Sequence, residues 1–243
     1  MPDNIYIFDF DGVICDSISE IFQTSLGSFL VYLELNSIKF RKFNNDDNEM
    51  ISMFRDLFHI AGSSDQMKNI WCEIFTKKML FSDTDLALKK IKNSHINYKK
   101  EFYIFREKLK NKSMKKWLSY HKIFEGFEDL LNNNRNANNF YIASAKDTNS
   151  IYEILKFNNI NFDKNKIYSS SQDDDKYIIF NNLSKLSYKN KITLIDDNFD
   201  NLLIGLKFNF TCYHANWGQS YKKQNSEKKI TEVTKNNLFE IIV

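Results

Sequence analysis

The feature that most constrains this chain is an apolar run near its start that closes with two aspartates. Residues 5–8 are Ile, Tyr, Ile and Phe, a combination typical of a buried β-strand, and Asp9, Asp11 and Gly12 follow closely. Buried strands seldom end in two carboxylates, because an unpaired buried charge is costly. A bound cation and a sharp turn would explain the pair, since Gly12 lets the backbone bend and come close to a ligand.

The spacing of the two aspartates adds a geometric expectation. Side chains alternate along a strand, so Asp9 and Asp11 are predicted to leave on the same face, one step apart. That arrangement suits a nucleophile with a proton-transfer partner beside it.

The same residues carry a family resemblance. Asp9-Phe10-Asp11-Gly12-Val13 resembles the first motif of the haloacid dehalogenase-like phosphohydrolases, and Phe8–Ser17 is similar to their phosphoglycolate phosphatase and β-phosphoglucomutase branch. Later segments resemble the remaining motifs in the expected order. They are the run 139–145 with Ser144 and Ala145, Lys176, the run 192–198 with Asp196 and Asp197, and a Trp-Gly turn within 211–218.

The resemblance implies a role for each catalytic residue. Asp9 is expected to attack phosphorus, while Asp11 protonates the leaving oxygen and then activates water. Ser144 and Lys176 are expected to neutralise phosphoryl oxygens, and the lysine also pairs with Asp9. The implied reaction is phosphoryl transfer through an aspartyl phosphate.

The resemblance also implies how phosphate and metal are bound. Gly12 and Ala145 join Ser144 and Lys176 at the phosphate. The expected cofactor is Mg²⁺, which favours oxygen ligands and relieves the repulsion between carboxylates and phosphate. The predicted metal residues are Asp9, Asp196, Asp197 and, through its main-chain carbonyl, Asp11.

Two of these residues have competing interpretations. Ser144 could simply cap the helix that follows it. Lys176 could be a solvated lysine at a helix start, because Tyr177 replaces the proline usual after the family's lysine and residues 173–175 are all aspartate. In that case Lys146 or Lys185 would fill its place.

The order of the segments predicts the fold class. Candidate strands are residues 4–10, 139–144, 166–170, 191–196 and 210–214. Helical spacing joins Ile151 to Asn158, and Leu202 to Phe210. Strands that alternate with helices predict an α/β fold with a doubly wound, parallel, Rossmann-like sheet. Ligands bind beyond the carboxyl ends of such strands, where Asp9, Ser144 and Asp196 lie.

The long segment between the first two candidate strands predicts a second domain. Residues 17–119 show mostly helical spacing and resemble a helical cap inserted into a core formed by residues 1–16 and 120–243. This segment carries a net charge of +6 and the remainder −3. A basic cap over an acidic core would attract a phosphorylated substrate, although most of its lysines are better explained as a solvated surface. Arg41, Lys42 and Arg55 are the candidates for substrate contact, and His59 is interpreted as structural.

Composition excludes several classes of protein. The hydrophobic fraction of 42% is sufficient for a globular core, and the net charge of +3 gives no nucleic-acid signal. Cys15, Cys72 and Cys212 are odd in number and widely spaced, which fits a reducing cytoplasm rather than a disulfide framework. With no apolar run of 18 residues and no segment resembling a signal peptide, no membrane association is expected.

Together these features predict a cytoplasmic phosphoric monoester hydrolase that acts on a small phosphorylated metabolite. An acid at position 11 disfavours the dehalogenase and phosphonatase branches, which lack it. A phosphomutase of the β-phosphoglucomutase type is one alternative. A non-catalytic phospholigand-binding protein on the same fold is another, although it would not need Asp9, Asp11 and the metal acids. The sequence leaves the substrate and the oligomeric state open.

Overall fold

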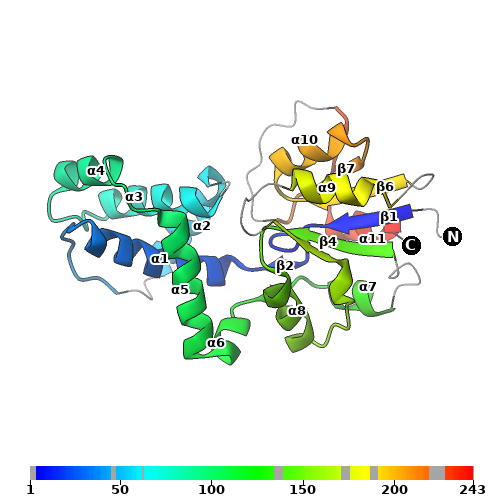
Figure 1. Ribbon diagram of the computed structural model, residues 1–243, viewed down its shortest axis with the longest axis horizontal. Coiled ribbons are helices and arrows are strands. Elements are labelled where there is room, and N and C mark those ends of the chain that lie inside the picture. Colours follow the sequence, from blue (N-terminus) through cyan, green and yellow to red (C-terminus); the bar gives the residue numbers. More distant parts are fainter. Residues whose placement is uncertain are drawn as a thin grey trace. The chain divides into compact units, whose positions relative to one another are not determined.

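The computed structural model describes residues 4–44, 48–61, 63–133, 139–170, 176–186, 191–218 and 228–242 of the chain (Figure 1). The chain divides into two compact units. Met1–Ser17 and His121–Val243 form one, here called the α/β unit, and Ile18–Tyr120 form the other, here called the helical unit.

The α/β unit is built on a six-stranded sheet in the order β5-β4-β1-β6-β7-β8, in which neighbouring strands pair in parallel. The strands are β1 Asn4–Phe8, β4 Phe140–Ser144, β5 Ile167–Ser169, β6 Lys191–Asp196, β7 Thr211–Ala215 and β8 Ile230–Val233. The chain builds outward from β1 through β4 to β5, then returns to the other side of β1 with β6. This order confirms the predicted doubly wound α/β fold and places the reversal of strand order at β1.

Helices cover both faces of this sheet because its strands are apolar on both faces (Figure 1). They are α7 Phe127–Asn133, α8 Thr148–Phe157, α9 Tyr177–Ser184, α10 Phe199–Lys207 and α11 Lys235–Ile242. On β1, Ile5 and Ile7 belong to the apolar cluster formed with α9 and α10. Phe8 instead packs edge-on against Phe127 of α7, with ring centroids 6.2 Å apart.

Several boundaries differ from the sequence prediction. The first strand ends at Phe8 rather than at residue 10, so Asp9 and Asp11 lie in the loop beyond it. Phe210 is not part of the helix that contains Leu202, because α10 ends at Lys207 and Asn209 adopts a positive φ of 60°. The edge strand β8 was absent from the predicted set.

A short two-stranded antiparallel sheet was also not predicted from the sequence. It pairs β2, Cys15–Asp16, with β3, Lys122–Ile123. These two strands adjoin the points where the chain leaves the α/β unit and returns to it. This two-stranded sheet therefore joins two segments that are more than 100 residues apart in the sequence.

The core of the helical unit is rich in aromatic side chains. Its helices are α1 Ile18–Leu35, α2 Asn48–Leu57, α3 Met67–Lys77, α4 Thr84–Lys92, α5 Tyr98–Lys112 and α6 Met114–Leu118. Trp71 of α3 is fully buried and lies 5.4 Å from Phe22 of α1 and 5.2 Å from Phe54 of α2, measured between ring centroids. Among the described helices of the chain, none is both long and apolar enough to span a membrane.

Candidate functional site

Three carboxylates converge at the carboxyl ends of β1 and β6. Asp9 follows β1, Asp196 is the last residue of β6, and Asp197 comes next. Because β1 and β6 are paired neighbours, the Asp9 amide donates to the Ile195 carbonyl at 2.9 Å. One oxygen from each of the three aspartates falls within 4.8 Å of the others, and all three residues are buried.

Lys176 is the cation inside this cluster. It immediately precedes α9 and is only 3% exposed. Its Nζ lies 2.9 Å from Asp9 Oδ1 and 2.8 Å from Asp196 Oδ2. The interpretation of Lys176 as a solvated lysine is therefore wrong. Lys185 is exposed at the far end of α9, and residues 173–175 lie outside the described residues.

Asp196 is held by a set of donors that the sequence analysis did not identify. Its Oδ1 accepts from the Asn198 amide at 2.8 Å and from Asn201 Nδ2 at 3.2 Å, and Asn201 also reaches Oδ2 at 3.1 Å. Asn201 lies in the first turn of α10, five residues after Asp196, and this spacing was the available signal. Since both oxygens of Asp196 already accept hydrogen bonds, this residue is well placed to orient Lys176.

The electrostatics of the cluster follow from its burial. Burial raises the pKa of Asp9 well above its ordinary range; Lys176 opposes the rise, whereas Asp196 and Asp197 add to it. Burial also works to lower the pKa of Lys176, but the neighbouring carboxylates of Asp196 and Asp9 outweigh it and raise that pKa. The lysine is thus firmly protonated, and its charge pairs with Asp9 and Asp196.

The space around Asp197 depends on two glycines. A Cβ on Gly12 would lie 2.2 Å from Asp197 Oδ2, and a Cβ on Gly218 would lie 2.2 Å from Asp197 Cβ. Gly12 also has a φ of +92°, which disfavours any other residue there. On the main-chain side, His214 Nε2 lies 3.0 Å from the Asp197 carbonyl oxygen. The Trp-Gly turn, predicted from the sequence alone, thereby gains a physical role beside Asp197.

The donor set fits a divalent cation. Among the described residues, three carboxylates and one ammonium come together in a buried place, so the cluster is rich in anionic oxygens. Carboxylate oxygens are the ligands that Mg²⁺ prefers. The Asp11 carboxylate is not among the three clustered groups.

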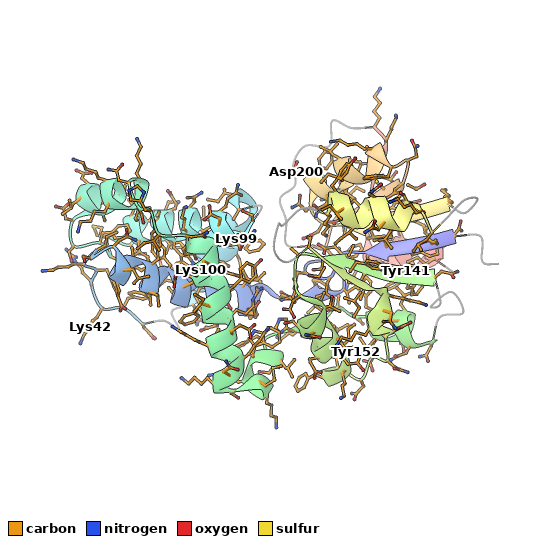
Figure 2. All side chains as sticks on the ribbon, in the orientation of Figure 1. Lys42, Lys99, Lys100, Tyr141, Tyr152 and Asp200 are labelled. Carbon is orange, nitrogen blue, oxygen red and sulfur yellow. The ribbon has the colours of Figure 1, made fainter. Side chains whose placement is uncertain are left out.

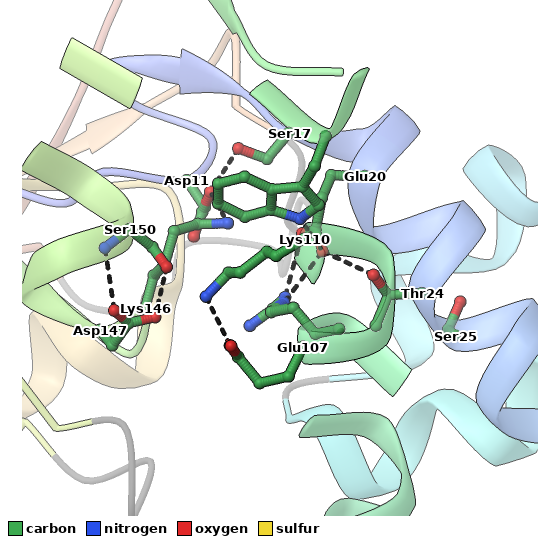
Figure 3. A network of polar contacts seen from close by, with 12 residues as sticks. Asp11, Ser17, Glu20, Thr24, Ser25, Glu107, Lys110, Lys146, Asp147 and Ser150 are labelled. Atoms are coloured by element: carbon green, nitrogen blue, oxygen red, sulfur yellow. Dashed lines mark hydrogen bonds and ion pairs between the residues drawn. The ribbon is translucent and has the colours of Figure 1, made fainter. Parts of the chain in front are cut away.

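The Asp11 side chain contacts a different set of residues (Figure 3). The Ser17 hydroxyl donates to its Oδ1, and Lys146 Nζ lies 3.3 Å from the same oxygen. Lys146 Nζ also lies 3.3 Å from His121 Nε2. The expected same-face arrangement rested on a strand that continues through residue 10, and the strand ends before Asp9. Lys146, weighed in the sequence only as a substitute for Lys176, contacts the other aspartate.

Ser144 ends β4, the neighbour of β1 on the side away from β6. Because Ile142 pairs with Phe8, Ser144 lies at the edge of the sheet where Asp9 follows β1. It does not cap the next helix: the N-cap of α8 is Asp147, which accepts from the Ser150 amide. The Ser144 hydroxyl accepts instead from the Lys146 amide at 3.1 Å, and Ala145 between them is partly exposed.

The remaining candidates lie on the surface. Arg41, Lys42 and Arg55 of the helical unit are exposed, and Lys42 is visible in Figure 2. Asp200 is an exposed acid in the first turn of α10 (Figure 2). The side chain of His59 lies outside the described part of the chain.

The helical unit contains its own buried ion pair. Arg106 on α5 donates to both oxygens of Glu20 on α1, at 2.9 and 3.0 Å (Figure 3). Thr24 and the Trp117 indole donate to Glu20 Oε1 at 2.6 and 3.3 Å. The Arg106 guanidinium also lies 4.8 Å from the centre of the Phe102 ring. In these described contacts, one carboxylate binds one guanidinium and also accepts from neutral donors.

Comparison with known proteins shows which solved structures share this architecture. No protein-family model and no curated protein matches the sequence. Among solved structures, the chain is similar to a predicted phosphatase from Clostridium acetobutylicum, with 18% identity, a TM-score of 0.61, and coverage of 100% of this chain and 99% of that one.

Two further structures agree. A haloacid dehalogenase-like family hydrolase from Streptococcus pneumoniae has 16% identity and a TM-score of 0.60, with all of both chains covered. A predicted phosphoglycolate phosphatase from Haemophilus somnus has 13% identity and a TM-score of 0.60, covering 98% of this chain and 96% of that one. At these identities the likeness establishes a shared fold, and it agrees with the resemblance found in the motifs.

Proposed function

We propose that this chain, which has the fold of the haloacid dehalogenase-like hydrolases, is a magnesium-dependent phosphatase acting on a small phosphomonoester. The observation that carries the proposal is the cluster of Asp9, Asp196 and Asp197 around Lys176, buried at the carboxyl ends of neighbouring strands. Gathering three acids in the interior is costly for stability, and a bound divalent cation would offset that cost.

Asp9 is proposed as the nucleophile. Its Oδ1 accepts from the Phe10 amide at 2.7 Å and contacts Lys176, so the carboxylate is held firmly through one oxygen. Attack by Asp9 on phosphorus forms an aspartyl phosphate as the ester P–O bond breaks, and Asp11 gives its proton to the leaving oxygen. Asp11 then removes a proton from water, whose oxygen attacks phosphorus and releases Asp9.

The cofactor is proposed to be Mg²⁺, held by the carboxylates of Asp9 and Asp197 and by the main-chain carbonyl of Asp11. Asp196 contributes through the Lys176 that it orients, and one of its oxygens lies within 4.8 Å of the other two aspartates. When bound, the ion supplies positive charge that balances the carboxylates and the phosphoryl oxygens. Lys176, Ser144 and the backbone around Gly12 and Ala145 are proposed to hold the phosphoryl oxygens not balanced in this way.

The two units are proposed to have different tasks. The α/β unit carries the chemistry, and the helical unit acts as a cap that selects the substrate and limits access of water. Residues 18–120 carry an excess of lysine and arginine over acids, which supports a phosphorylated substrate. A small phosphorylated metabolite is the proposed substrate class.

The test is phosphate release from a panel of phosphorylated metabolites by wild type and Asp9→Asn, each with Mg²⁺ and with EDTA. Asp200→Asn, which removes an exposed acid from the same unit, is the matched control. Magnesium-dependent release that Asp9→Asn abolishes and Asp200→Asn retains supports the proposal. Release that continues in Asp9→Asn, or binding of the panel without any turnover, contradicts it.

A further inference from the structure

The partners of Asp11 assign a role to Lys146 that the family motifs do not require. Lys146 lies in the loop between β4 and α8, and its side chain is 1% exposed, whereas the side chain of Asp11 is 24% exposed. The lysine thus contacts the aspartate from the interior, and the aspartate alone of the two reaches the surface.

Burying a lysine is costly unless an anion compensates it. An apolar residue would fill the same space without that cost, so the lysine must be explained by what it contacts. Its Nζ lies 3.3 Å from Asp11 Oδ1 and 3.3 Å from His121 Nε2, with His121 itself only 3% exposed. With the ammonium as donor, Nε2 of His121 accepts and the ring carries its proton on Nδ1.

The position of Lys146 is itself well determined. Its amide donates to the Ser144 hydroxyl at the end of β4, and Asp147 next to it caps α8. Strand and helix therefore fix the loop from both sides. On the opposite side of Asp11, Ser17 donates to the same Oδ1 that faces Lys146 (Figure 3). Two donors from distant segments thus converge on one carboxylate oxygen.

We propose that Lys146 is a positioning residue for Asp11: with Ser17 it anchors Oδ1, so that Oδ2 is directed toward the oxygen that exchanges a proton. A carboxylate with one oxygen anchored has its second oxygen available for proton transfer. His121 supports the lysine by accepting from the same ammonium. This inference rests on the proposed function, because it assumes that Asp11 serves the leaving group.

The kinetic test compares two substrates of similar size but unequal need for an acid. Phenyl phosphate has a poor leaving group and p-nitrophenyl phosphate a good one. The measured quantity is kcat/KM, which covers all steps through loss of the leaving group. Lys146→Met should lower kcat/KM for phenyl phosphate about 100-fold and for p-nitrophenyl phosphate less than about 10-fold. Lys146→Arg should retain much of the wild-type kcat/KM for phenyl phosphate. Lys185→Met, an exposed lysine of the same unit, is the control.

A crystallographic readout works even without turnover. In crystals of Lys146→Met the Asp11 carboxylate should leave the place that it occupies in the wild type. If Lys146→Met does not fold, Lys146→Gln, which keeps an N–H donor but removes the charge, replaces it in both measurements. An unmoved Asp11 together with equal loss on both substrates overturns the inference. If the wild type releases no phosphate from any substrate, the proposed function fails, and the position of Asp11 in the two crystals still decides the role of Lys146.

Discussion

Both units of this chain bury ionised side chains, but they do so in opposite ways. In the helical unit, Glu20 and Arg106 form a balanced pair with two hydrogen bonds, and Thr24 and Trp117 add neutral donors. In the α/β unit, Asp9, Asp196 and Asp197 cluster together, and Lys176 pairs with the first two of them. Among the described contacts, one cluster pairs a single carboxylate with a guanidinium, and the other gathers three carboxylates with one ammonium.

The contrast separates a structural cluster from a functional one. A buried ion pair that satisfies its own charge and hydrogen bonds joins two helices and needs no ligand. A buried cluster with excess charge of one sign is unfavourable alone and becomes favourable when a cation binds. Charge balance, rather than burial or pairing alone, therefore distinguishes the candidate active site from the ion pair of the helical unit.

The largest expected effect comes from removing the cation of each cluster. Lys176→Met and Arg106→Met should each lower the free energy of unfolding without metal by about 3–5 kcal/mol, because each leaves buried carboxylate charge uncompensated. Urea unfolding followed by circular dichroism measures this loss. The exposed lysines Lys185 and Lys112, changed to Met, are the controls and should alter the free energy by less than about 0.5 kcal/mol. Equal stability of the variants and controls would contradict the argument.

Magnesium should then separate the two variants. At a concentration 100 times its dissociation constant, Mg²⁺ should stabilise the wild type by about 2.7 kcal/mol. The deficit of Lys176→Met relative to wild type should narrow, since the ion replaces part of the lost charge. The deficit of Arg106→Met should stay the same. Thermal unfolding with Mg²⁺ or EDTA gives both values, and a parallel response of the two variants would show that charge balance does not distinguish the clusters.

A smaller effect is expected when a proposed metal-binding aspartate is displaced. Gly218→Ala places a Cβ 2.2 Å from Asp197 Cβ, so the aspartate must shift. Metal affinity should fall about 10- to 100-fold, the range typical when the support of a ligand is disturbed. Titration of Mg²⁺ followed by thermal unfolding measures the affinity. Asn216→Ala, an exposed neighbour in the same turn, should bind Mg²⁺ like the wild type.

The smallest expected effect is a pH dependence of the metal-free protein. Burial raises the pKa of Asp9, so protonation of this residue favours the folded state. Its contribution is fully present below the pKa of the unfolded chain, about 3.9, and is lost as pH rises through the raised value. In EDTA, Asp9→Asn should therefore be more stable than wild type at neutral pH.

The difference in unfolding free energy between wild type and Asp9→Asn should close as pH falls from neutrality to below about 3.9, because Asp9 then becomes protonated in the unfolded chain as well as in the folded one. The free energy of unfolding is measured against pH for wild type and for Asp9→Asn. Subtracting one curve from the other cancels the titration of the acids that both proteins share. A constant difference across this range would contradict the effect of burial on Asp9.

Much of the α/β unit was predictable from its apolar runs. Strands β4 to β7 lie within two residues of the predicted ranges, because each combines apolar residues with a polar boundary. The strand β8 escaped because it has four residues, two of them exposed at a sheet edge. The end of β1 was misplaced because Phe10 continues the apolar pattern although the chain already turns there.

The candidate site was predictable in its residues but not in its pairings. Asp9, Asp196, Asp197 and Lys176 meet as the motif order suggests. The hydrogen bonds of Asn201 to Asp196 and the contact of Lys146 with Asp11 were not foreseen. Both join residues whose side-chain directions depend on how a helix or a loop leaves the sheet.

By itself the sequence determined five of the strands, their parallel arrangement and the acidic residues at their carboxyl ends, because hydrophobic pattern and residue type act locally. Only the tertiary structure decided that Lys176 serves Asp9 while Lys146 serves Asp11. Lys146 follows an apolar segment and Lys176 follows three aspartates, yet neither local pattern says which aspartate each lysine contacts. Long-range electrostatics does: a buried ammonium is stable only where the fold brings a carboxylate within a few ångströms, and that distance is set by the packing of the whole unit.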